Sequence, residues 1–357
     1  MAENSKGKST LKKTENKDTA NKAKAIQKAK EPDNSQEKPP QDFVFTLNAS
    51  DSLNIAIKGI IEPDDHVITT KIEHNSVIRP INRMVHDRII EADFITFSQS
   101  GYVDPEDISR AIRKNTRAVI VNHGSNVIGT VQPIREIGRI CRDKNVIFIV
   151  DTCQTAGVVP IDIEEMNIDI LTFTGHKCLY GPMGIGGMYV REGLDVRPLR
   201  EGGTGVKSAY PFHLEEYPHR LECGTTNLIG IAGLNAGQKF LRAKNIDTLL
   251  KHELGLLKKL QDGFSSIPKL QFIGTKSLVN RVPVLSVNIE GKGPDQVGMR
   301  LDVDHNIAVR TGLECAPKVH EVLNTAPKGT VRFSIGAFNT EQDIIAAIEG
   351  MKEIASD

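Results

Sequence analysis

The stretch VIFIVDTCQTAG, residues 146–157, decides the fold class of this chain. Its first five residues are all apolar, which predicts a strand buried on both faces, because a strand with one wet face alternates apolar and polar residues. A carboxylate, Asp151, follows the strand directly. This pattern is typical of a parallel sheet covered by helices, in which ligands bind beyond the carboxyl ends of the strands.

Short apolar runs alternate with helical patterns on both sides of this stretch. We expect further strands at residues 43–47, 65–72, 89–95, 117–121, 168–173 and 187–190, and helices at residues 52–61, 76–86, 104–113 and 134–144. Strands separated by helices of about ten residues need crossover connections, which favour a mostly parallel sheet. The sequence therefore predicts the α/β class.

The pattern changes after about residue 234. Long helices are expected at residues 232–243 and 246–264, strands at residues 271–272, 284–289 and 331–335, and a closing helix at residues 341–354. We interpret residues 42–234 as a large domain and residues 235–357 as a smaller α+β domain.

Residues 1–41 differ from the rest of the chain. They contain ten Lys and six Asp or Glu, and neither an aromatic residue nor Val. Such a segment buries too little apolar surface to offset the entropy of ordering it, so we expect a disordered Lys-rich tail. Its net charge of about +4 leaves about −4 for the remainder. A transit peptide is an alternative that the absence of Arg disfavours, and a nucleic-acid tether rests on charge alone.

Overall composition narrows the function classes. The chain has 357 residues, and its 45 basic and 45 acidic side chains balance, which argues against a nucleic-acid or membrane-surface partner. No run of about 18 apolar residues predicts a membrane span, and the N-terminus lacks the apolar segment of a secretory signal. Five cysteines, an odd number, favour free thiols and a cytoplasmic location. No Cys and His residues have the spacing of zinc ligands, so no metal site is expected.

Polar residues follow the expected strands of the large domain. They are Ser50 in NASDS, His74 in EHNS, Asn126 in NHGSN, Asp151 and Gln154 in DTCQ, and Thr174, His176 and Lys177 in TGHK. Each cluster alone is more often a helix cap or a turn, but neighbouring strand ends meet in a parallel sheet, so together they predict one pocket. A lysine for an aldehyde, a carboxylate for a ring nitrogen and donors for a phosphate are the set that pyridoxal phosphate needs.

The motifs around these residues resemble those of a known family. VDTCQTAG (150–157) and TGHKCLYGPMGIG (174–186) closely resemble the class V aminotransferase family, and within it the branch of cysteine desulfurases and selenocysteine lyases. The resemblance continues in order through TTKIEHNSVIRP (69–80), NHGSNVIGTVQPI (122–134), RLECGTTNLIGIAGL (220–234), VRTGLECAP (309–317) and GTVRFSIGAFNT (329–340). It implies a fold-type I enzyme whose large domain binds pyridoxal 5'-phosphate.

The resemblance implies roles for the residues that contact the ring of this cofactor. Lys177 matches the lysine that forms the Schiff base, and Asp151 matches the acid that pairs with the pyridinium nitrogen. Gln154 matches the residue that hydrogen-bonds the ring hydroxyl oxygen. His74 matches the imidazole that stacks on the ring and takes part in catalysis.

Other matches concern the phosphate and the neighbouring subunit. Ser50, Thr174 and His176 match the phosphate donors, and Asn126 matches a residue near the ring and the substrate. Thr225, in CGTTN, matches a residue that reaches the phosphate of the neighbouring subunit. The resemblance therefore implies a homodimer with shared sites.

Two matches lie in the smaller domain. Arg332, in TVRFS, matches the arginine that binds the α-carboxylate of the substrate, for which a guanidinium offers two parallel donors. Cys315 matches the nucleophile that attacks the substrate sulfur, and it lies between Gly312 and Pro317 in an expected loop where a thiol can be exposed. The implied reaction converts L-cysteine to L-alanine and leaves a persulfide on Cys315, whose sulfur then passes to an acceptor protein.

Three functions stay open at this point. The first is a cysteine desulfurase that supplies sulfur for iron–sulfur clusters or for thio-modification. The second is a selenocysteine lyase or another C–S lyase of the family that does not use Cys315. The third is a catalytically impaired homologue that acts as a binding protein, because residues 1–42 resemble none of the N-terminal segment that family members carry.

Overall fold

The computed structural model describes residues 43–357. The predicted Lys-rich tail, residues 1–41, lies outside the described residues. Both the large and the small sheet belong to one compact unit. In this part of the chain every helix is too short or too polar to cross a lipid bilayer.

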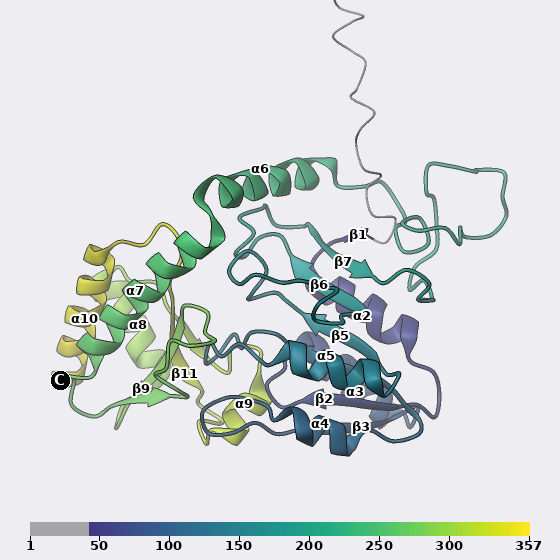
Figure 1. The fold of residues 1–357 in the computed structure, drawn as a ribbon. Coiled ribbons are helices and arrows are strands. Elements are labelled where there is room, and N and C mark those ends of the chain that lie inside the picture. Colours follow the sequence, from purple (N-terminus) through teal and green to yellow (C-terminus); the bar gives the residue numbers. More distant parts are fainter. Residues whose placement is uncertain (1–42) are drawn as a thin grey trace, which may run out of the picture. The chain divides into compact units, whose positions relative to one another are not determined.

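A seven-stranded sheet occupies the first half of the described chain (Figure 1). Its strands are β1 (Phe43–Thr46), β2 (His66–Thr70), β3 (Glu91–Ile95), β4 (Thr116–Asn122), β5 (Ile147–Asp151), β6 (Ile170–Thr174) and β7 (Gly186–Val190). Their spatial order is β1-β7-β6-β5-β4-β2-β3. The strands from β3 to β6 pair in parallel, and β7 pairs antiparallel with both of its neighbours, β6 and β1. The prediction of a mostly parallel sheet is confirmed.

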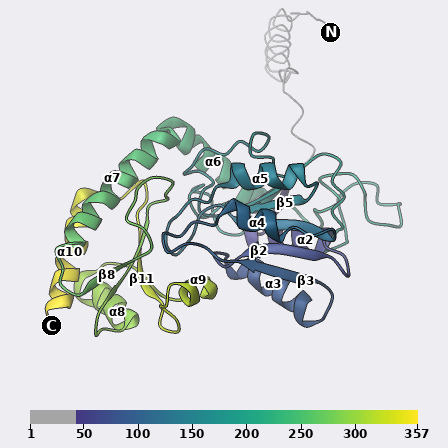
Figure 2. The same ribbon diagram turned by 60° about the horizontal axis from the view of Figure 1, so that its bottom comes forward.

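Helices cover both faces of this sheet. They include α2 (Ala49–Ile60), α3 (Asn75–His86), α4 (Pro105–Ala111) and α5 (Ile134–Asp143). Figure 2 shows α4 and α5 on one side of the strands and α3 on the other. α2 and α3 share one apolar cluster with the sheet, and α4 and α5 share a second. The sequence expected all four helices, because each has apolar residues at helical spacing.

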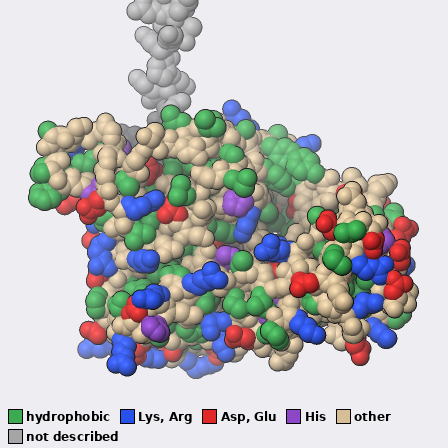
Figure 3. Space-filling model, turned by 180° about the vertical axis from the view of Figure 1, so that it is seen from behind, with side chains coloured by type: hydrophobic (Ala, Val, Ile, Leu, Met, Phe, Trp, Pro, Cys, Tyr) green, Lys and Arg blue, Asp and Glu red, His purple; other side chains and the backbone are tan. Residues whose placement is uncertain are grey.

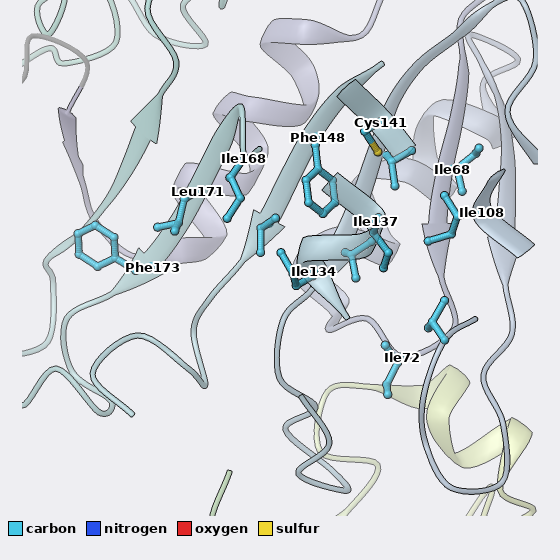
Figure 4. Packing of buried hydrophobic residues seen from close by; sticks show 14 of the residues in the cluster. Ile68, Ile72, Ile108, Ile134, Ile137, Cys141, Phe148, Ile168, Leu171 and Phe173 are labelled. Carbon is cyan, nitrogen blue, oxygen red and sulfur yellow. The ribbon is translucent and has the colours of Figure 1, made fainter. Parts of the chain in front are cut away.

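Side chains along β4 show why the strand is apolar at consecutive positions. Ala118 and Ile120 lie in the cluster under α2 and α3, while Val119 and Val121 lie in the cluster under α4 and α5. Successive side chains point to opposite faces of a strand, so two covered faces demand an apolar residue at every position. Figure 4 shows the second cluster, in which Phe148 of β5 packs beside residues of α5.

The second half of the chain builds a smaller antiparallel sheet. Its strands are β8 (Leu270–Ile273), β9 (Val284–Ile289), β10 (Arg310–Gly312) and β11 (Thr330–Ser334), in the order β10-β11-β9-β8. The helices of this half are α6 (Leu228–Lys244), α7 (Ile246–Phe264), α8 (Pro294–His305), α9 (Pro317–Val322) and α10 (Glu341–Ser356). The sequence analysis missed α8, α9 and β10.

The two sheets are joined by a few direct contacts beyond β4. The hydroxyl of Ser286 on β9 donates a hydrogen bond to the carbonyl oxygen of Val127 at 2.5 Å. The N–H of Val131 donates to the carbonyl oxygen of Asn280 at 2.8 Å. These bonds hold the loop after β4 against the small sheet, and that loop contains Asn126.

Gly138 marks the point where α5 packs closely against the main chain of Met166. A Cβ added at Gly138 would lie 1.9 Å from the carbonyl oxygen of Met166, which is backbone and cannot swing away. Ala ordinarily stabilises a helix relative to Gly, but we expect Gly138→Ala to lower the free energy of unfolding by about 2 kcal/mol, because the added methyl has no room. Chemical denaturation measures the change.

Gly255 provides the matched control. It lies exposed within α7, and a Cβ added there meets no atom within 4 Å. Gly255→Ala should raise the stability by about 0.5–1 kcal/mol, as helix propensity predicts. Equal effects of the two substitutions would contradict the close approach of α5 to Met166.

Candidate functional site

A cavity of about 340 Å³ opens at the carboxyl ends of the parallel strands. Its size falls in the range of small-molecule sites. Its lining comprises Asn48, Ala49, Ser50, Leu53, His74, Ser76, Asn122, Asn126, Asp151, Cys153, Gln154, Thr174, His176 and Lys177. The structure thus brings eight predicted residues to one cavity, namely Ser50, His74, Asn126, Asp151, Gln154, Thr174, His176 and Lys177.

Strand topology explains this convergence. Segments that follow β1, β2, β4, β5 and β6 each contribute to the lining, and the last four of these strands are neighbours in the sheet. Because these strands run in one direction and end at the same edge, residues as distant in sequence as Ser50 and Lys177, which are 127 positions apart, face one space.

Hydroxyl groups and a helix N-terminus form one end of the cavity. Ser50 lies in the first turn of α2, and its Oγ is 2.6 Å from the Oγ of Ser76 in the first turn of α3. The hydroxyl of Thr174 is 3.1 Å from Nδ1 of His176. Hydroxyls and the N–H groups of a helix N-terminus bind phosphate. Ser76 joins this group, although the sequence analysis did not select it.

The hydrogen bonds of His74 fix its tautomer. His74 caps α3, and its Nδ1 accepts the backbone N–H of Ser76 at 3.0 Å. A neutral ring therefore carries its proton on Nε2. Burial lowers the pKa of His74; Lys177 also lowers it, and Asp151 acts in the opposite direction. The imidazole is consequently neutral near pH 7.

Asp151 is a nearly buried carboxylate at the end of β5. Its exposed fraction is 3%, and its Oδ1 accepts the N–H of Cys153 at 2.9 Å. A carboxylate in this position needs a positive partner to offset its lost hydration. The half-buried Lys177 lines the same cavity.

Gly157 allows the loops of Asp151 and Lys177 to approach each other closely. Its φ of +84° lies in the left-handed region that glycine adopts readily. A Cβ there would lie 2.4 Å from the carbonyl oxygen of Cys178, the neighbour of Lys177. The two loops therefore pack backbone against backbone.

The cavity fits pyridoxal phosphate by the chemistry of its donors. Ser50, Thr174 and His176 with the start of α2 can hold a phosphate, and Asp151 can receive a protonated ring nitrogen. The Oδ1 of Asn126 is buried with no hydrogen-bond partner among residues 43–357, so a polar group of a ligand would satisfy it. Lys177 supplies the amine.

Thr225 does not reach this cavity. It is exposed in the loop before α6 and lines two other hollows, one of them with Arg200 and Glu222. Its predicted role toward a neighbouring subunit does not require it to line the cavity of its own chain.

Cys315 and Arg332 also lie outside the lining, but Asn126 connects both to it. Cys315 is exposed, and its carbonyl oxygen accepts the N–H of Asn75 at 2.7 Å. The amide Nδ2 of Asn126 donates to the carbonyl oxygen of Glu314 at 2.7 Å. The Nη1 of Arg332 donates to the carbonyl oxygen of Asn126 at 2.8 Å. One residue of the cavity thus contacts both the loop of Cys315 and the side chain of Arg332.

Two buried carboxyl groups near the site escaped the sequence analysis. Glu73 precedes His74, and its Oε1 accepts bonds from Thr70 and from the N–H of Asn122. Burial raises the pKa of Glu73 to about 8. Glu314 precedes Cys315, and its side chain is fully buried. The sequence signal for these two residues is an acid directly before a candidate site residue. That signal does not show whether the carboxyl group is buried or exposed to solvent.

The chain was compared with known proteins. The family model "Aminotransferase class-V" matches residues 4–346, so the match extends into the segment 1–42, where our sequence analysis found no resemblance. A probable cysteine desulfurase of Methanothermobacter thermautotrophicus is 34% identical over 320 residues, which cover 88% of this chain and 79% of that protein. The cysteine desulfurase IscS of Clostridium botulinum is 32% identical over 328 residues, with the same coverage.

A solved structure shares the fold. The apo structure of a cysteine desulfurase from Thermococcus onnurineus superposes with a TM-score of 0.82 at 33% identity, and it covers 88% of this chain and 80% of that one. Family model, relatives and fold agree with the chemistry of the cavity. The chain belongs to the class V aminotransferase family.

Proposed function

We propose that the chain is a pyridoxal phosphate-dependent cysteine desulfurase that converts L-cysteine to L-alanine and keeps the sulfur as a persulfide on Cys315. The observation that carries the proposal is Asn126, which lines the cavity and also bonds the loop of Cys315 and the guanidinium of Arg332. The names of the relatives support the same reaction.

Different residues of the cavity would bind different groups of the cofactor. Pyridoxal phosphate, when bound, supplies an aldehyde for the substrate amine and a ring that accepts electrons. Ser50, Thr174 and His176 would bind its phosphate, and Gln154 would donate to the ring hydroxyl oxygen. Asp151 would keep the ring nitrogen protonated, because a buried carboxylate favours a positive partner.

Lys177 and His74 would act next to the reacting atoms. With the cofactor bound, Nζ of Lys177 would take a proton from the substrate Cα and return it during turnover. His74 would stack on the cofactor ring. Its neutral imidazole carries the proton on Nε2, since Nδ1 accepts the N–H of Ser76. A neutral imidazole does not compete with Lys177 for the carboxylate of Asp151.

Cys315 and Arg332 act on the substrate itself. Arg332 binds the α-carboxylate, and the thiolate of Cys315 attacks the substrate sulfur as the Cβ–S bond breaks. One S–S bond forms and one C–S bond is lost, so L-cysteine and the Cys315 thiol yield L-alanine and the Cys315 persulfide without an external oxidant. An exposed position lets the persulfide meet an acceptor protein.

A homodimer completes the proposal. Met183, Leu228 and Ile229 are 84%, 72% and 86% exposed, and the bond from Asn227 to the carbonyl oxygen of Gly184 keeps their segments together. The long loop between β7 and α6 adds exposed apolar side chains, which Figure 3 shows at the upper left. Thr225 lines a hollow together with Leu228 of this apolar surface. A partner that covers it would bring Thr225 toward a second cavity.

We also propose a domain division, a cellular location and a sulfur acceptor for this chain. Residues 42–234 serve as the cofactor domain and residues 235–357 as the small domain, in line with the two separate sheets. The five free cysteines suit a reducing, cytoplasmic location. Sulfur delivery to an acceptor protein for iron–sulfur cluster assembly is supported by the IscS name of a relative.

Replacement of the nucleophile tests the reaction. Cys315→Ala should lower the release of alanine and sulfide from L-cysteine in a reductant by at least about a hundredfold, because burial raises the pKa of Cys153, the thiol in the lining of the cavity, and keeps it protonated. The visible absorbance of the bound cofactor should stay, since Cys315 does not line the cavity. Alanine analysis, sulfide detection and a spectrum measure these quantities.

Cys141→Ala is the control for this experiment. The Cys141 thiol is buried in the core, and burial raises its pKa, so its loss should leave turnover unchanged. Desulfuration that persists in Cys315→Ala would favour a C–S lyase that does not use Cys315. A purified chain that takes up no pyridoxal phosphate would favour the binding-protein alternative.

Ile229→Asp tests the homodimer. A charge at this exposed apolar position should convert the dimer to a monomer and loosen the cofactor, because Thr225 would lose its partner site. Light scattering after size-exclusion chromatography gives the mass, and dialysis gives the cofactor retained. Ile345→Asp, at a 52% exposed position of α10, should leave both unchanged. A monomeric unmodified chain would refute the proposal.

A further inference from the structure

Glu314 occupies an unusual position beside Cys315. It follows β10, its side chain is fully buried, and both Glu314 and Cys315 have positive φ angles of +50° and +62°. Residues other than glycine adopt this region at a cost of order 1 kcal/mol each. The carbonyl oxygens of both residues accept bonds, from Asn126 and Asn75 respectively, which hold the backbone in this shape.

The carboxylate of Glu314 contacts two residues of β11. Its Oε1 accepts the hydroxyl of Thr330 at 2.8 Å, and its Oε2 lies 3.5 Å from Nη1 of Arg332. That Nη1 also donates to the carbonyl oxygen of Asn126. The Nε of Arg332 is buried and has no partner within residues 43–357. One side of the guanidinium is therefore occupied and the other is unused.

We infer that Glu314 is a positioning residue: it fixes Nη1 of Arg332 so that the Nε edge stays available for the α-carboxylate of the substrate. The inference rests on the proposed role of Arg332 in the desulfurase reaction. A planar carboxylate binds a guanidinium through two parallel bonds, and only an edge whose donors are unpaired can supply both. Without an anchor, Arg332 would lose this orientation.

The charges around Glu314 support an anchor of this kind. Arg310 lies directly opposite Arg332 in the pairing of β10 with β11, and like charges at such a pair repel. Glu314 faces both arginines. Cys315 also acts on Arg332. His320 of α9 interacts with the main chain of Leu313, the residue before Glu314, and burial lowers the pKa of His320.

The anchor depends on pH in a defined direction. Burial raises the pKa of Glu314 to about 7, although Arg332, Thr330 and Arg310 act to lower it. Glu314 is therefore ionised above about pH 7 and holds Arg332 there, whereas below pH 7 it is protonated and the ion pair is lost. The KM for L-cysteine should rise as the pH falls from 8 to 6.

Glu314→Gln tests the inference in the full-length holoenzyme. At pH 8 we expect the KM for L-cysteine to rise about tenfold, the size expected for loss of a charged contact, while kcat changes less than about twofold. The main-chain bonds of Glu314 and Cys315 do not depend on the carboxylate, so the nucleophile stays in place. The rise of KM between pH 8 and pH 6 should disappear in the variant.

Two further variants separate the possible outcomes. Glu321→Gln, at an exposed position of α9, is the matched control and should behave as the unmodified enzyme. Arg332→Ala should raise KM strongly; if it does not, the proposed carboxylate site fails. If Arg332→Ala raises KM and Glu314→Gln does not, only the inference about Glu314 is overturned.

Thr330→Val covers the case in which Glu314→Gln does not fold. It removes the hydroxyl that holds Oε1 and keeps the charge, so KM should rise about threefold with kcat preserved. An unchanged KM in this variant would overturn the inference.

Discussion

Asp151 sets the constraint on which the site depends. A carboxylate that is 3% exposed at the end of an apolar strand is costly unless a positive group compensates it. The parallel strands on either side bring Lys177, His74 and Asn126 to the same edge, and the helices on both faces keep water from the strand itself. The fold and the chemistry of the cavity therefore depend on one buried charge. The covered sheet removes Asp151 from water, and the edge of the sheet carries the side chains that can compensate its charge.

The contacts of Asn126 extend this arrangement to the small sheet. Its side chain and its carbonyl oxygen bond residues that follow β10 and lie on β11, while Ser286 of β9 holds the adjacent Val127. Arg332 thus lies on the small sheet and Cys315 follows one of its strands, whereas the cavity lies at the edge of the large sheet. The loop that contains Asn126 bonds to both parts.

The sequence predicted the large sheet well because its signals are local. Apolar runs such as residues 146–150 and helices with apolar stripes indicate their own burial. α8, α9 and β10 were missed because they are short or carry few apolar positions: only Pro294, Val297, Gly298 and Leu301 of α8 are buried. The lining of the cavity and a Schiff-base role for Lys177 were predicted from the residues at the strand ends, whereas the role predicted for Cys315 came from resemblance. Glu314 could not be found, since its burial depends on tertiary contacts with Thr330 and Arg332.

Gly157 has a consequence for how such a site can change over time. The loop after β5 and the loop after β6 meet there through main-chain atoms, with no space for a side chain between them. Substitutions elsewhere in the lining can reshape the cavity for other amino acids while this main-chain contact is kept. The spacing between Asp151 and Lys177 is thereby kept when other residues are substituted. The substrate specificity of the cavity can change while this spacing stays the same.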